Sequence, residues 1–189
     1  MASNALHPGW FELDIHVYSA LVPVQGPASG DPGRREPERQ RRDDFPRAFE
    51  AAFGRLQVVV EEAYLAESEW PCQVAAAIRA AFDFAATDPV VADLLTNEAL
   101  ARGRDGLSRY RRLIDFSAGL LAPGRDLVPD GTLLPSTLEH SLAGGITLLV
   151  AQRVDQGRAG ELPQLAADAI QFALTPYLGM REAHRIATN

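Results

Sequence analysis

The chain has 189 residues and a mass of 20.5 kDa, of which 47% are hydrophobic, so it can bury a substantial core. All 18 basic residues are arginine, and the 25 acidic residues give a net charge of −7, which excludes a general electrostatic match to nucleic acid. The single cysteine, Cys72, excludes an internal disulfide and a cysteine-based zinc cluster. No apolar run approaches the roughly 18 residues of a membrane span, and the core-like uncharged stretch 141–152 has only 12, so no membrane partner is expected.

The first 44 residues are expected to form an irregular segment. Residues 11–18 alternate apolar and polar side chains, which predicts a short strand. Residues 25–44 hold three prolines, three glycines, five arginines and five acidic residues, a composition typical of a disordered linker. The first 30 residues contain no lysine or arginine, unlike a secretory signal, so a cytoplasmic location is expected.

From Phe45 onward, apolar residues recur every three or four positions, which predicts helices. Asp44 is expected to cap the first helix, with Pro46 in its first turn. Further helices are predicted over residues 70–86, 89–101, 107–121, 137–156, 163–174 and 180–187. The predicted fold is therefore an all-α helical bundle over residues 45–189, preceded by the irregular segment.

The sequence around Ser136 has the pattern of a helix start. Ser136 and Glu139 stand three residues apart before an apolar run, so a capping box is expected there, with each side chain bonded to the other residue's backbone amide.

The two longest C-terminal helices carry small and apolar residues on more than one face. Gly144 and Gly145 cost about 1 kcal/mol each relative to alanine inside a helix, and close approach of another helix would offset that cost. We therefore expect a homodimer with a four-helix interface. A glycine-tolerant core helix in a monomer stays open as the alternative. The expected interface residues are Leu142, Gly144, Ile146, Thr147, Val150, Ala166, Ile170 and Ala173.

Three stretches of the chain carry a resemblance to a known family. They are FPRAFEAAFGRL (45–56), WPCQVAAAIRAAFDFAATDPVVADLL (70–95) and LEHSLAGGITLLVAQRVDQGRAGELPQLAADAIQFALTPYLGMREAHRIA (138–187). In order and spacing, residues 45–187 resemble the C-terminal effector-binding and dimerisation region of TetR-family transcriptional regulators. The resemblance implies a role in transcription regulation and a small-molecule effector held among the helices.

The resemblance also implies which residues line the ligand cavity. Aromatic walls with a few polar groups suit an apolar or aromatic ligand that has one or two hydrogen-bonding atoms. The candidates at the matching positions are Trp70, Phe82, Tyr110, Ile114, Ser117 and His140. For each of them, ordinary core packing is the alternative.

The helix-turn-helix domain of this family has no counterpart in the residues before Phe45. We therefore expect no DNA binding by this chain alone. We expect it to form a heterodimer with a full-length regulator and thereby block that regulator's binding to a two-site operator. Two alternatives stay open. Residues 1–44 could reflect a misassigned start or a shifted reading frame, and the chain could be a stand-alone dimer that binds or sequesters a small molecule.

No pattern in the sequence indicates an active site. The four histidines, His7, His16, His140 and His184, have no metal-binding spacing, and phosphate-loop and nucleophile-elbow motifs are absent. We expect His140 to be the one enclosed histidine. The chain is accordingly expected to be no enzyme and to hold neither a metal nor a cofactor.

Overall fold

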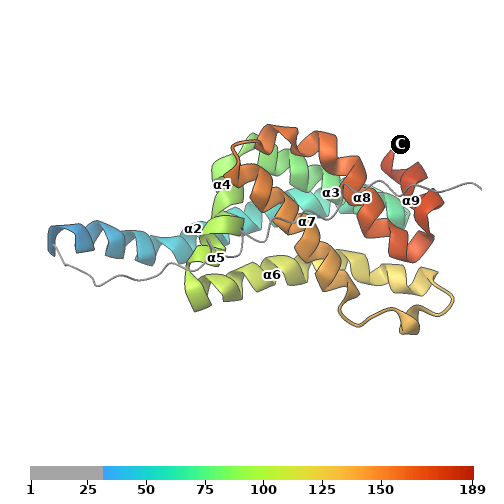
Figure 1. Ribbon diagram of the computed structural model, residues 1–189, viewed down its shortest axis with the longest axis horizontal. Helices are drawn as coiled ribbons and strands as arrows, with labels where there is room; N and C mark the ends of the chain where they lie inside the picture. The colour runs from blue at the N-terminus through green and yellow to red at the C-terminus, as the bar shows by residue number, and fades with distance from the viewer. Residues whose placement is uncertain (1–31) are drawn as a thin grey trace, which may run out of the picture. The chain divides into compact units, whose positions relative to one another are not determined.

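The computed structural model describes residues 32–189, with side chains from residue 44 onward (Figure 1). Every regular element in this range is helical, which confirms the all-α prediction. The chain divides into two units, residues 1–39 and residues 40–189, and the second holds every site discussed below. The strand predicted over residues 11–18 lies outside the described residues.

Helix α2, Pro32–Leu65, begins well before the predicted start after Asp44. The expectation of an irregular segment is therefore wrong for residues 32–44. The low apolar content of these residues predicted disorder, but backbone helix formation does not require an apolar face at every turn.

Most of the other helices begin and end within a few residues of their predicted limits. They are α3 (Trp70–Thr87), α4 (Pro89–Asp93), α5 (Ala99–Ala101), α6 (Gly103–Leu121), α7 (Leu138–Asp155), α8 (Leu162–Leu178) and α9 (Met180–Ala187). Single 3₁₀ turns connect some of them, namely η2 (Ala122–Leu127), η3 (Gly131–Leu133) and η4 (Ala159–Glu161).

Two helices differ from their predicted course. The helix predicted over residues 89–101 is interrupted by a π-helical turn, η1 (Leu94–Glu98). Helix α8 continues through Pro176, where a break or bend was predicted. Leu174 and Tyr177 are buried on either side of this proline, and their burial offsets the loss of one backbone hydrogen bond.

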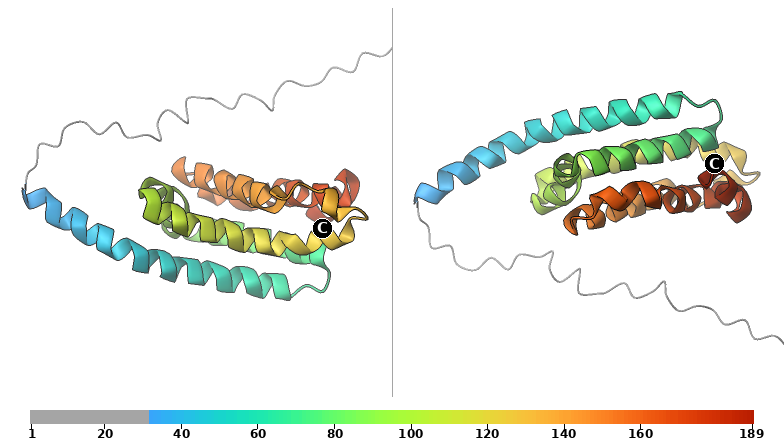
Figure 2. Two further views of the ribbon diagram at one scale, coloured as in Figure 1. Left: turned by 90° about the horizontal axis from the view of Figure 1, so that it is seen from below. Right: turned by 90° about the horizontal axis from the view of Figure 1, so that it is seen from above.

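The helices of residues 40–189 form layers. Figure 2 shows α2 on one side, α7 and α8 on the other, and α3 and α6 between them. The larger core cluster is built mainly from α3, α7, α8 and α9, and Phe82, Leu162, Ile170 and Leu174 are its most deeply buried large side chains.

A second core cluster attaches α2 to η1, α5 and α6. Phe45, Phe49 and Phe53 lie one turn apart on α2 and contact one another in series. The guanidinium group of Arg102 lies 4.8 Å from the centre of the Phe45 ring, and that of Arg112 lies 5.5 Å from the Phe53 ring. These arginines cover the aromatic residues with cation–π contacts that leave their charge near water.

The loop between α6 and α7 is held by one arginine. Arg125 donates two parallel hydrogen bonds to the Glu139 carboxylate, from Nε to Oε1 at 2.7 Å and from Nη2 to Oε2 at 2.8 Å. Its remaining donors bond the backbone carbonyls of Gly131, Leu134 and Pro135. All five donors of the guanidinium group are therefore used, and the loop is folded around it.

Glu139 is the buried member of this ion pair, with 8% of its side chain exposed. Its Oε1 also accepts a hydrogen bond from the Tyr177 hydroxyl on α8 at 3.0 Å. The predicted capping box is therefore wrong, since no side chain caps the start of α7 and the Glu139 carboxylate serves Arg125 and Tyr177 instead. We call Arg125, Glu139 and Tyr177 the Glu139 clamp.

The clamp shifts the acid–base behaviour of its members. Burial raises the pKa of the Glu139 carboxyl, but hydrogen bonds from Arg125, the backbone and Tyr177 outweigh burial, so this pKa lies below its ordinary value. Burial and the carboxylate of Glu139 both raise the pKa of the Tyr177 hydroxyl. The carboxylate form of Glu139 is therefore the one that stabilises the fold.

Glu139→Gln is expected to lower the free energy of unfolding at pH 7 by about 2 kcal/mol, since the buried ion pair is lost but Arg125 can still reach water. The lowered pKa of Glu139 stabilises the folded wild-type chain above the ordinary carboxyl pKa of 4.5, and this stabilisation disappears as the pH falls below it. The difference between the two proteins should therefore shrink below pH 4.5, measured by urea unfolding from pH 7 to pH 3. A difference that is constant with pH would contradict this role for the charge.

Candidate functional site

The helical unit contains a partly open cavity with two adjoining lobes. Lobe 1 has a volume of about 80 Å³ and lobe 2 a volume of about 90 Å³. Six residues from α2, α3, α6 and α7 line both lobes, so the two spaces lie side by side and share part of their wall. These shared residues are Leu56, Ala81, Phe82, Ser117, Ile146 and Thr147.

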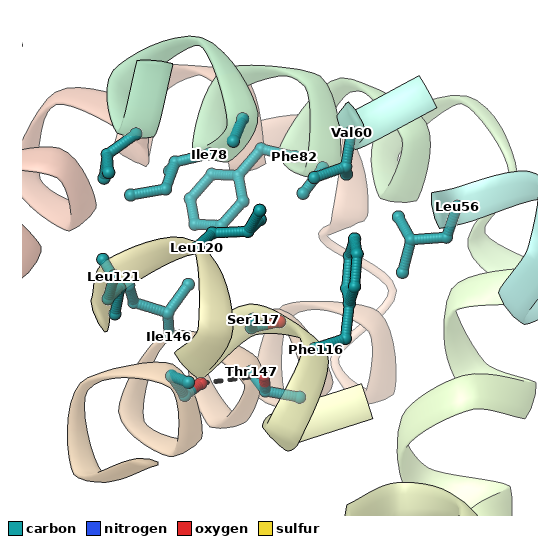
Figure 3. Close-up of a pocket in the computed structure, with 14 residues that line it drawn as sticks. Leu56, Val60, Ile78, Phe82, Phe116, Ser117, Leu120, Leu121, Ile146 and Thr147 are labelled. Carbon is teal, nitrogen blue, oxygen red and sulfur yellow. Dashed lines mark hydrogen bonds between the residues drawn. The ribbon is translucent and has the colours of Figure 1, made fainter. Parts of the chain in front are cut away.

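Each lobe adds its own wall residues to the shared six. Lobe 1 extends along α3 and the end of α6, with Val60, Val74, Ala77, Ile78, Phe116, Leu120, Leu121 and Ala143. Lobe 2 extends toward α4 and η1, with Phe84, Ala85, Ala92, Leu95, Thr96, Leu113 and Val150. Figure 3 shows Phe82 from α3 facing Leu120 from α6, with Ser117 and Thr147 on the opposite wall.

The cavity wall is almost wholly apolar because the amphipathic faces of four helices meet there. Its polar side chains are three hydroxyl groups, each bonded to the carbonyl of the residue four positions earlier. Ser117 Oγ donates to Leu113 O at 3.0 Å, Thr147 Oγ1 to Ala143 O at 2.8 Å, and Thr96 Oγ1 to Ala92 O at 2.7 Å. Among the described residues, no charged side chain lines either lobe.

The π-helical turn η1 forms part of the wall of lobe 2 through Leu95 and Thr96. Asn97, on the same turn, donates hydrogen bonds to Asp93 Oδ1 at 3.0 Å and to Ala151 O of α7 at 3.1 Å. Short π-helical turns inside α-helices occur frequently at functional sites. This turn therefore distinguishes lobe 2 from ordinary helix packing.

Two of the six candidate ligand residues lie on the cavity wall. Phe82 is fully buried on α3 and Ser117 is half-buried on α6, and both contact the two lobes. The other four, Trp70, Tyr110, Ile114 and His140, do not line the cavity.

Trp70 and Tyr110 have structural roles in other parts of the unit. The Trp70 ring meets the Tyr177 ring edge to face, with 5.2 Å between centroids, and its Nε1 donates to Leu120 O at 3.0 Å. Tyr110 packs against the second core cluster, where burial raises the pKa of its hydroxyl. Ile114 is half-buried on α6, outside both clusters.

The expectation that His140 is enclosed is wrong. Its side chain is 56% exposed, and Nε2 lies 3.1 Å from Asp115 Oδ1 of α6. The reason is the rotation of α7, because the neighbouring residue Glu139 faces inward to the clamp and turns His140 toward solvent.

The eight predicted interface residues lie in three different environments of this chain. Leu142, Ala166, Ile170 and Ala173 are buried in its core. Ile146, Thr147 and Val150 line the cavity. Only Gly144 is left on the partly exposed side of α7, and a Cβ atom built there would meet nothing within 4 Å.

The described residues offer little for metal or membrane chemistry. Among them, no three His, Cys, Asp or Glu side chains gather in an arrangement that could hold a metal ion. No helix in the described part of the chain has the length and apolar character needed to cross a membrane.

Comparisons with known protein families, curated proteins and solved structures find no match for this chain. The functional argument therefore rests on the cavity and on the exposed surfaces of the helices.

The wall residues that sequence reasoning missed came from recognisable patterns. Leu56 and Val60 belong to the apolar stripe of α2, and Ala81 and Ile78 to that of α3. The stripes predict which residues face inward, but they do not predict where inward-facing side chains are too small to fill the space.

Ala81→Val is expected to fill part of the cavity, because Ala81 lines both lobes. Two buried methyl groups should outweigh the helix-propensity cost of valine and stabilise the fold by about 1 kcal/mol. Ala76→Val is the matched control, at an equally half-buried position of α3 that lies on a different face and away from the cavity wall, and it should show the propensity cost alone. Equal free energies of unfolding for the two variants in urea would contradict the presence of the cavity.

Proposed function

We propose that this chain is the effector-binding and dimerisation part of a TetR-like transcriptional regulator. In this proposal it senses a small apolar or aromatic molecule in the interior cavity. The observation that carries the proposal is the cavity itself, an apolar space bounded by α2, α3, α6 and α7 in the centre of an all-α unit. The resemblance of residues 45–187 supplies the regulatory context.

Dimerisation is supported by the exposed side of α7 and α8. Leu148 and Phe172 are 46% and 51% exposed, which is unusual for large apolar side chains. A Cβ atom at Gly145 would lie 3.4 Å from Phe172 Cε1, so the aromatic ring lies beside a glycine. We define the Phe172 face as Gly144, Gly145, Leu148 and Phe172, and propose that two copies of the chain meet there.

Gly144 argues most directly for a partner. Glycine inside a helix costs about 1 kcal/mol relative to alanine. Nothing in this chain lies within 4 Å of a Cβ built at Gly144, so packing within the chain does not require the glycine. Close approach of a helix from a second copy gives it a physical reason.

Gly144→Leu is expected to leave the fold intact and to convert the dimer into a monomer, because the added side chain occupies the proposed contact. Native mass spectrometry of the full chain measures the change from twice 20.5 kDa to 20.5 kDa. Gly119→Leu is the control, since Gly119 is an exposed glycine of α6 with nothing within 4 Å of its Cβ. A Gly144→Leu variant that remains dimeric would contradict the Phe172 face as the interface.

The same spectra test the sensing role through mass retained with the wild-type dimer. A small-molecule adduct that Ala81→Val reduces would support the cavity as its site. An adduct bound by a chain that associates with no regulator would instead favour a stand-alone binding or sequestering dimer.

The proposal expects no DNA recognition by this chain alone. Its charge of −7 opposes phosphate binding, so fluorescence anisotropy with duplex DNA at low salt should show no sequence-selective binding. We propose that the chain acts on transcription as a heterodimer with a full-length regulator, which blocks that regulator's binding to a two-site operator. Tight, selective binding by the purified chain would overturn this part of the proposal.

A further inference from the structure

We propose that the cavity selects a neutral, apolar molecule that carries a hydrogen-bond donor, such as a hydroxyl group on an aromatic ring, and excludes anions. This inference rests on the proposed function, because it names the ligand class of the same cavity. Its basis is the direction of the hydrogen bonds made by the three hydroxyl groups on the wall.

Each of these hydroxyl groups has already used its only proton. A serine or threonine hydroxyl has one donor and two acceptor lone pairs. Ser117, Thr147 and Thr96 donate to Leu113 O, Ala143 O and Ala92 O at 3.0, 2.8 and 2.7 Å. What each oxygen can offer to a ligand is therefore a lone pair, and the wall accepts hydrogen bonds.

Within the described part of the chain, the rest of the wall offers no competing donor. The lining residues of both lobes are otherwise apolar, and their backbone amides belong to helices whose N–H groups are paired along the helix. An anion brought into such a space would lose its hydration and gain neither a positive charge nor an N–H partner, which makes its burial strongly unfavourable. A ligand hydroxyl or N–H would instead find acceptors.

The acceptors are placed where a single ligand can reach them. Ser117 on α6 and Thr147 on α7 line both lobes and lie on the same wall, opposite Phe82 (Figure 3). Thr96 adds a third acceptor from the π-helical turn, on the wall of lobe 2 alone. A donor group at the junction of the lobes therefore meets Ser117 and Thr147 while its ring contacts Phe82.

The size of the lobes limits the ligand to a small molecule. A dry cavity of about 150 Å³ in another protein binds benzene. Adjoining lobes of about 80 and 90 Å³ therefore suit one aromatic ring or a compact aliphatic group. Phenol, toluene and benzoate are a matched set of probes, since they share the ring and differ in the substituent.

The test is a titration of the full chain with each probe, followed by ¹H–¹⁵N NMR to give the Kd and the residues affected. We expect phenol and toluene to shift resonances of the wall residues, and benzoate to shift none. The decisive quantity is the ratio of the Kd of phenol to that of toluene, because toluene carries no donor.

The ratio should rise about 3- to 10-fold in a Ser117→Ala/Thr147→Val variant, the effect of losing one neutral hydrogen bond. Thr175→Val is the matched control, since Thr175 Oγ1 on α8 donates to Gln171 O at 2.6 Å in the same way but lies outside the cavity wall. It should leave the ratio unchanged. Ser117→Ala alone serves as a milder second variant, with a smaller rise in the same direction.

The outcomes separate this inference from the proposed function. An unchanged ratio of the two Kd values in both Ser117→Ala/Thr147→Val and Ser117→Ala would overturn the donor selectivity and leave a sensing cavity in place. Binding of benzoate at the cavity wall would do the same. If neither phenol nor toluene shifts any wall residue, both the inference and the small-molecule sensing role fail.

Discussion

The arrangement of the helical unit depends on the ion pair between Arg125 and Glu139. Arg125 holds the loop between α6 and α7 with hydrogen bonds from all five of its donors. Glu139 links this loop to α8 by accepting a hydrogen bond from the Tyr177 hydroxyl. A single buried carboxylate thereby fixes the start of α7 relative to α6 and α8. The cost of burying the charge is offset by bidentate geometry and a third hydrogen bond, which is the condition under which a buried ion pair is tolerated.

Once the start of α7 is fixed, its rotation assigns a different environment to each of its faces. Leu142 faces the core, Ile146 and Thr147 face the cavity, and Gly145 and Leu148 face outward. The helix is therefore apolar on nearly every side for three separate reasons. Its composition therefore resembles that of a helix packed between two partners. One of its apolar faces, however, lines the cavity and not a partner.

The sequence predicts the helices better than it predicts the neighbours of their side chains. Periodicity and Pro–Gly breaks place α3, α6 and α9 within a few residues, because these signals are local. Glu139 was assigned to a capping box because Arg125 and Tyr177, 14 and 38 residues away, are beyond the reach of any local pattern. The same limit explains why Phe82 and Ser117 were placed at the cavity, whereas Thr147 was assigned to a dimer interface. The periodicity of a helix identifies which residues face inward. It does not show whether the space that such a side chain points into is filled by other side chains.

The cavity and the second core cluster share a wall, which gives ligand binding a physical route to α2. Leu95 and Leu113 line lobe 2 and also belong to the cluster that holds Phe49 and Phe53 of α2. A ligand in lobe 2 would touch these two residues directly, as well as Leu56 of α2 itself. Because close-packed side chains transmit strain, a ligand that fills lobe 2 bears on side chains that pack against α2. Helix α2 runs from Pro32 to this contact, so the cavity and the first helix of the described residues are in direct contact through Leu56.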